Sequence, residues 1–141
     1  MKKTILVSSL TILTLFLSGC VTTTESALDA QQSQVKVRSI QTRAFDTTDK
    51  AKMLKVVIST LQDLDFVLDK ADLELGTVTG TKFVNNQALK MTVTVRPRGE
   101  AQLLVRANAE YGIDPIDSPE AYQDFFASLE KSLFLSAHQV D

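Results

Sequence analysis

A short apolar run near the start of the chain decides how much of the sequence is left to fold into a domain. The run covers residues 4–17, follows the basic start Met1-Lys2-Lys3 and ends at Leu17-Ser18-Gly19-Cys20, which holds the only cysteine of the 141 residues. A basic start, a short apolar segment and small residues behind it are typical of a secretory signal peptide. The run is shorter than the roughly 20 apolar residues of a membrane-spanning helix. We therefore expect residues 1–19 to be a signal peptide that is removed on export.

The end of this run resembles the lipobox of bacterial lipoproteins. Leu17 is apolar, Ser18 and Gly19 are small, and Cys20 follows them. The resemblance implies that the Cys20 thiol is joined to diacylglycerol, that the signal is cut between Gly19 and Cys20, and that the new amino group is acylated with a fatty acid such as palmitate. One such chain holds a protein only marginally, whereas several anchor it stably. An uncleaved anchor and a free thiol are the alternatives.

The residue behind the cysteine indicates which membrane the lipid occupies. In Gram-negative lipoproteins an aspartate at this position usually retains the protein at the inner membrane, and this chain has Val21 instead. The resemblance therefore implies the periplasmic face of the outer membrane of a Gram-negative bacterium, with the membrane as one partner.

The charge of the remaining chain excludes one class of partner. Without residues 1–19 the chain has 122 residues, enough for one domain with a hydrophobic core. Lys2 and Lys3 leave with the signal, so 13 basic residues face 17 acidic ones and the formal net charge is −4. This balance argues against nucleic acid as a partner, because nucleic-acid-binding domains carry a basic excess. With Cys20 acylated, no thiol is left for a disulfide or a thiolate metal site.

The residues after the cysteine predict a tether. Residues 20–34 are rich in Thr, Ser and Gln and lack apolar periodicity, which favours a flexible segment. Fully extended, such a segment reaches on the order of 50 Å. A short helix over residues 27–32 is the competing interpretation. Residues 35–141 are then expected to form the folded domain.

Two stretches with helical periodicity predict helices. The first covers residues 47–63, with Asp46 as the N-cap and Asp49 in the first turn. Its apolar residues recur at spacings of three and four: Ala51, Leu54, Val57, Ile58, Leu61 and Leu64. The second covers residues 119–137, where Ser118 precedes a proline at the first helical position. Its apolar stripe contains Tyr122, Phe125, Phe126, Leu129 and Leu133.

Alternation of apolar and polar residues predicts five strands. They cover residues 35–45, 66–69, 77–84, 89–95 and 103–109. Asn85-Asn86 and Pro97-Arg98-Gly99 are expected to form turns, and residues 111–117 a loop. The predicted order is β-α-β-β-β-β-α. This order indicates an α+β fold in which two helices pack on one face of an antiparallel sheet.

One segment of the domain resembles a known family. In residues 61–78 a helix ends, an apolar strand follows, and an acidic turn leads through Gly76 into a second strand. This resembles the helix-grip repeats of the C lipoprotein of the outer-membrane β-barrel assembly machine. It is more similar still to small bacterial lipoproteins that contain this one domain. The resemblance implies a helix-grip-like arrangement and a place in the cell envelope.

The sequence offers no residue set that indicates catalysis or a cofactor. The only histidine is His138, for which we expect a capping or surface role near the C-terminus. A metal site needs several converging ligands, and no serine lies in a Gly-x-Ser-x-Gly motif. We therefore expect a protein that is not an enzyme, with no cofactor and no metal.

Two charged groups of residues leave two interpretations each. An acidic cluster is either a solvated helix end and turn, which we favour, or a carboxylate pair or calcium site: Asp63, Asp65, Asp69, Asp72 and Glu74. A basic stripe is expected on the outward face of the strands: Lys90, Arg96, Arg98 and Arg106. It either protects the sheet and keeps it soluble, or meets an anionic partner or lipid headgroups.

Two functions fit these patterns. The first is a non-enzymatic adaptor, anchored through Cys20, that contacts a protein partner in an assembly, efflux or secretion complex of the envelope. The second is a carrier of a lipid or small molecule between sheet and helix, in a cavity lined by Phe83, Met91, Phe125 and Phe126.

Overall fold

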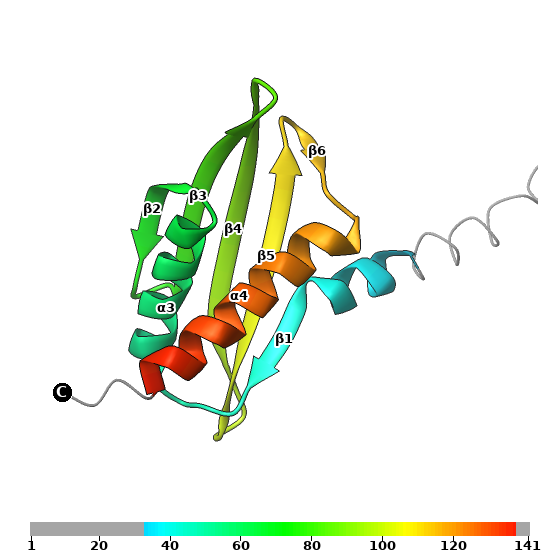
Figure 1. Ribbon diagram of the computed structural model, residues 1–141. Coiled ribbons are helices and arrows are strands. Elements are labelled where there is room, and N and C mark those ends of the chain that lie inside the picture. Colours follow the sequence, from blue (N-terminus) through cyan, green and yellow to red (C-terminus); the bar gives the residue numbers. More distant parts are fainter. Residues whose placement is uncertain (1–32, 138–141) are drawn as a thin grey trace, which may run out of the picture. The chain divides into compact units, whose positions relative to one another are not determined.

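The structure of the chain is a computed structural model that describes residues 33–137 (Figure 1). The predictions for the signal peptide, for Cys20, for residues 21–32 and for His138 lie outside these described residues.

The described residues form a mixed α+β domain, which confirms the predicted fold class. A helix over residues 33–40 comes first. The elements that follow, labelled as in Figure 1, are β1 (Thr42–Phe45), α3 (Lys50–Asp63), β2 (Val67–Asp72), β3 (Thr77–Val84), β4 (Gln87–Arg98), β5 (Gln102–Tyr111), β6 (Asp114–Pro115) and α4 (Pro119–Ala137). The predicted boundaries of β3 and α4 are confirmed to the residue.

All strand pairs are antiparallel. The sheet has the order β1-β5-β4-β3-β2, and β6 also pairs with β5. The long hairpin of β4 and β5 lies at its centre, with a register that runs from Leu89 opposite Tyr111 to Arg98 opposite Gln102. On the outer edge of β5, β1 pairs with residues 103–106 and β6 pairs with residues 110–111. Among the described residues, no strand therefore lies beside residues 107–109 of β5 on that edge.

The core lies between the sheet and the two long helices. Every second residue is buried from Met91 to Val95 in β4 and from Leu103 to Ala109 in β5, as expected for strands that have one covered face. These side chains form one cluster with buried residues of α3 and α4, and Figure 1 shows both helices crossing in front of the sheet. From α4 the cluster takes Tyr122, Phe125, Phe126 and Leu129, each fully buried. Among the described residues, no helix combines the length and apolar character that crossing a bilayer requires.

The first long helix begins later than predicted, and its buried face contains most of the predicted stripe together with further residues. Asp49, not Asp46, is the N-cap, and its carboxylate accepts a hydrogen bond from the backbone N–H of Lys52 at 2.9 Å. Ala51 is exposed, whereas Met53 and Val56 are buried. The buried face is wider than the predicted stripe because α3 packs against the sheet on one side and against α4 on the other.

The predicted strand over residues 35–45 is wrong for most of its length. Residues 33–40 are helical, including the last two residues assigned to the tether, and β1 covers only residues 42–45. Val37 and Ile40 lie three residues apart and so share a helical face, while Val35 is 66% exposed. The backbone N–H of Gln41 closes the helix on the carbonyl of Val37 at 3.1 Å. A short apolar run of this kind fits both periods, so periodicity alone does not separate helix from strand.

Two predicted connections also differ. Pro97 lies inside β4 opposite Leu103 of β5, and the turn follows at residues 99–101, with Gly99 at φ +62°. The proline is tolerated because β3 starts at Thr77 opposite Thr94, so β4 has no β3 partner at this point. The predicted loop over residues 111–117 begins with the end of β5 and contains β6.

Candidate binding site on the sheet

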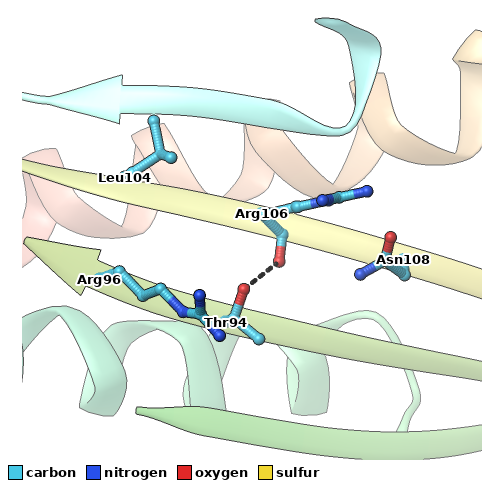
Figure 2. Close-up of a pocket in the computed structure, with 5 residues that line it drawn as sticks. All are labelled: Thr94, Arg96, Leu104, Arg106 and Asn108. Carbon is cyan, nitrogen blue, oxygen red and sulfur yellow. Dashed lines mark hydrogen bonds between the residues drawn. The ribbon is translucent and has the colours of Figure 1, made fainter. Parts of the chain in front are cut away.

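A pocket of about 280 Å³ lies on the face of the sheet opposite the core (Figure 2). Its lining residues come from two neighbouring strands: Thr94 and Arg96 from β4, and Leu104, Arg106 and Asn108 from β5. They alternate with buried residues such as Val95 and Val105, so their side chains point to the opposite face. The cross-strand pairs Thr94–Arg106 and Arg96–Leu104 place them side by side. The sheet thus carries a small hollow with two guanidinium groups, one amide, one hydroxyl and one apolar side chain.

The guanidinium of Arg106 is held in place from the edge of the sheet. Its Nη2 donates to Oε1 of Gln41 at 3.3 Å, and Gln41 is 7% exposed. The amide Nε2 of Gln41 donates in turn to the hydroxyl of Tyr122 in α4 at 3.1 Å. A buried polar chain therefore runs from the open face of the sheet to the core side.

The same two residues, Gln41 and Tyr122, also accept hydrogen bonds from the backbone of β5 where no described strand pairs with its outer edge. The backbone N–H of Ala107 donates to the carbonyl of Gln41 at 2.9 Å, and that of Ala109 donates to the Tyr122 hydroxyl at 3.2 Å. The hydroxyl itself donates to the carbonyl of Ile116 at 2.6 Å. Buried backbone groups need such partners, which explains why a glutamine and a tyrosine hydroxyl lie where no strand pairs with β5.

Neither arginine of the pocket has a carboxylate partner in residues 33–137. Arg43 does pair with Glu130, at 2.6 Å, but it lies opposite Val105 in the register and stacks on Phe126 at 4.8 Å, on the helix side of the sheet. Arg96 is exposed, and no described acceptor binds its guanidinium. The Nε of Arg106 is buried without a hydrogen-bond acceptor in the described part of the chain. No Asp or Glu of residues 33–137 lines the pocket, so within this part of the chain its positive charge is uncompensated at short range.

Only two of the four residues of the predicted basic stripe line the pocket. Lys90, Arg96 and Arg98 follow the same alternation along β4 as Thr94, but only Arg96 lines the pocket together with Arg106. Lys90 lies opposite Glu110 of β5, and Arg98 lies at the far end of β4 opposite Gln102.

A second hollow, of about 270 Å³, lies between the end of β1 and α3. It contains two carboxylates that already have partners: Asp49 caps α3, and Asp46 accepts from the amide of Gln102 at 2.6 Å. Because both carboxylates of this hollow already accept hydrogen bonds within the chain, we take the pocket on the sheet as the candidate site.

The acidic cluster is spread along the surface. Asp69 accepts from the Thr81 hydroxyl at 2.7 Å, and Asp72 accepts from the backbone N–H of Leu75 at 2.8 Å within the turn after β2. Asp63, Asp65 and Glu74 are exposed. In the part of the chain that the structure describes, no three His, Cys, Asp or Glu side chains come together as metal ligands.

The side chains expected for a carrier cavity are not all together. Met91, Phe125 and Phe126 are buried in the core cluster, and the rings of the two phenylalanines meet edge to face at 5.2 Å. Phe83 is 78% exposed and does not belong to that cluster.

Sequence reasoning missed Gln41, Thr94, Leu104 and Asn108. The alternation that indicated Arg96 and Arg106 also assigns Thr94, Leu104 and Asn108 to the same face, so three of the four could have been found. Gln41 gave no signal, because its contacts lie 65 and 81 residues away along the chain.

The fold and the pocket define a small α+β domain with one packed and one open sheet face, the open face carrying an arginine-lined hollow. No protein-family model matches the chain, and no curated protein matches it significantly. The lipobox and helix-grip resemblances therefore stay predictions from the sequence.

Proposed function

We propose that this chain is an envelope lipoprotein that acts as a non-enzymatic adaptor. Acyl chains on Cys20 hold it at the periplasmic face of the outer membrane of a Gram-negative bacterium. The open face of its sheet contacts a protein partner in an assembly, efflux or secretion complex. The motif Leu17-Ser18-Gly19-Cys20 supports the anchor, and the arginine-lined pocket supports the contact.

The single observation that carries the contact is the pair of arginines, Arg96 and Arg106, that have no carboxylate partner among the residues that the structure describes. Antiparallel sheets often leave one face to solvent, so an open polar face alone indicates nothing more than solubility. A face kept only for solubility does not need an arginine fixed through a buried glutamine, as Arg106 is by Gln41. Arginine is also among the residues enriched where proteins bind one another.

The anchor is tested by metabolic labelling with a clickable palmitate. The natural chain should take up the label and fractionate with outer membranes, and Cys20→Ser should lose the label and appear in the soluble periplasmic fraction. Ser26→Ala, in the segment behind the lipobox, is the matched control and should keep both properties. An unlabelled natural chain would refute the anchor.

The adaptor role is tested by affinity purification from gently solubilised membranes. The natural chain should co-purify reproducibly with at least one envelope protein, and Arg96→Glu should reduce the yield of that protein without changing labelling at Cys20. A chain recovered only as a free monomer would contradict the adaptor role, whatever the outcome of the labelling.

A further inference from the structure

We propose that the pocket between β4 and β5 binds a carboxylate side chain from an acidic segment of the partner protein. The proposal rests on the adaptor function and adds the chemistry of the contact. Its basis is the set of donors that line the pocket, the way Arg106 is held, and the size of the hollow.

The pocket presents donors without acceptors. Arg96 has a full guanidinium fork. Arg106 uses only Nη2 within the described chain, which leaves Nη1 without an acceptor there, whereas its Nε is buried and out of a ligand's reach. The Thr94 hydroxyl reaches the carbonyl of Arg106 only at 3.5 Å, which is a weak bond. The Asn108 amide also lines the hollow (Figure 2). Planar guanidinium forks match a carboxylate in two parallel hydrogen bonds, and such charged bonds are the stronger ones.

Part of this site is rigid before anything binds. Gln41 orients Arg106, and the Tyr122 hydroxyl orients Gln41. Gln41 and Tyr122 are both buried. The remaining lining residues stand on two paired strands of the central hairpin. A donor that is already ordered loses less entropy on binding, so the pocket favours an acceptor that fits its existing geometry.

The dimensions and donor types favour an acidic protein segment over a phosphate or a lipid surface. At about 280 Å³ the hollow is at the small end for whole ligands and suits one side chain, with Leu104 as an apolar wall for its methylene stem. Phosphate sites commonly add backbone N–H donors from a helix start or a glycine-rich loop. Here the β4 and β5 backbones pair with one another, and most of their outer edges pair with neighbouring strands. Where no strand lies beside them, the N–H groups of Val95, Ala107 and Ala109 donate to Gly76, Gln41 and Tyr122, so the free donors are side chains.

The test measures binding of a short fluorescein-labelled peptide, rich in glutamate with leucines beside it, to the full chain in mild detergent by fluorescence anisotropy. The natural chain should bind this peptide and not its glutamine counterpart. Arg96→Gln should weaken binding by about tenfold or more, since a bidentate charged pair is lost. Arg98→Gln removes the same charge from the same strand outside the pocket, and should change binding by no more than about twofold.

Loss of Arg106 can also disturb the sheet edge, so the pocket needs variants that leave Arg106 in place. Asn108→Ala and Thr94→Val remove one neutral donor each and should weaken peptide binding severalfold, with circular dichroism unchanged. Equal losses from Arg98→Gln and Arg96→Gln would overturn the proposal, because overall charge would then explain the binding. No binding of the acidic peptide would overturn it too.

Two further probes separate the competing occupants. A phosphoserine version of the peptide, or phosphatidylglycerol vesicles added to delipidated chain, should bind more weakly than the glutamate peptide. Tighter binding of either with the same dependence on Arg96 would overturn the carboxylate assignment. A partner that co-purifies equally well with Arg96→Gln would refute this inference and leave the adaptor role standing. If the natural chain takes up no palmitate label but still binds the peptide in an Arg96-dependent way, the anchor would be refuted and this inference would stand.

Discussion

At the scale of single residues, the turn between β2 and β3 depends on a glycine. Gly76 has φ +74°, and a Cβ built there would lie 2.5 Å from the carbonyl oxygen of Val95. The Gly76 carbonyl also accepts a hydrogen bond from the backbone N–H of Val95 in β4 at 2.8 Å, so the turn cannot move away from β4 without losing this bond. Position 76 thus excludes a side chain both by backbone conformation and by space.

We predict that Gly76→Ala lowers the free energy of unfolding by roughly 2–4 kcal/mol, combining left-handed strain with overpacking. Gly99 is the matched control, since it has φ +62° but nothing within 4 Å of an added Cβ. Gly99→Ala should cost about 1 kcal/mol, from the backbone alone. Urea denaturation of both variants checks the difference, and equal losses would show that the close approach to Val95 is unimportant.

At the scale of elements, the start of α3 shows what local sequence leaves undecided. Asp46 and Asp49 both precede the apolar stripe, and either could serve as a cap by residue type. In the structure Asp49 caps α3, and Asp46 binds Gln102 at the far end of the β4–β5 hairpin. We predict that Asp49→Ala lowers the free energy of unfolding by about 1 kcal/mol and Asp46→Ala by about 0.5 kcal/mol or less. Urea denaturation at neutral pH distinguishes them, and the reverse order would place the cap at Asp46.

The start of α4 gives a prediction for pH. A hydrogen bond from its own backbone N–H, and then one from the Ser118 hydroxyl, lower the pKa of Glu120 below its ordinary value of 4.5. A lowered pKa in the folded state means that the ionised carboxylate stabilises the fold above the ordinary pKa. This contribution is lost as the pH falls through the folded-state value. We predict that Glu120→Gln is less stable than the natural chain at neutral pH, and that the two converge in acid below the ordinary pKa. Urea midpoints of both chains across this pH range measure the difference in stability. A difference that does not change with pH would contradict the lowered pKa of Glu120.

How far the sequence predicts the elements depends on how local their causes are. The α4 helix and β3 follow from a proline start, a long apolar stripe and a clean alternation, all within the segment itself. The helix over residues 33–40 and the short β1 were missed because Val35 and Val37 fit the period of a strand while Val37 and Ile40 fit that of a helix, and pairing with β5 decides the outcome. For the candidate site, alternation placed Arg96 and Arg106 on one face. The anchoring of Arg106 by Gln41 is a long-range contact that no local pattern encodes.

At the scale of the whole molecule, one hydroxyl joins the core to the open face of the sheet. Tyr122 is fully buried in α4, and its hydroxyl serves Gln41, the N–H of Ala109 and the carbonyl of Ile116. The outer edge of β5 and the orientation of Arg106 therefore depend on an atom in a helix on the other side of the sheet.

We predict that Tyr122→Phe lowers the free energy of unfolding by roughly 2–4 kcal/mol, because it leaves several buried polar groups without a partner while filling the same space. It should also weaken binding of the acidic peptide severalfold, since Gln41 no longer holds Arg106 in one orientation. Tyr111→Phe is the matched control: its hydroxyl makes one exposed bond, to the carbonyl of Val84 at 2.7 Å. That variant should lose about 0.5 kcal/mol and bind the peptide as the natural chain does. Urea denaturation and fluorescence anisotropy on the same samples measure both effects. A Tyr122→Phe chain that is destabilised yet binds normally would show that the pocket does not depend on the buried polar chain.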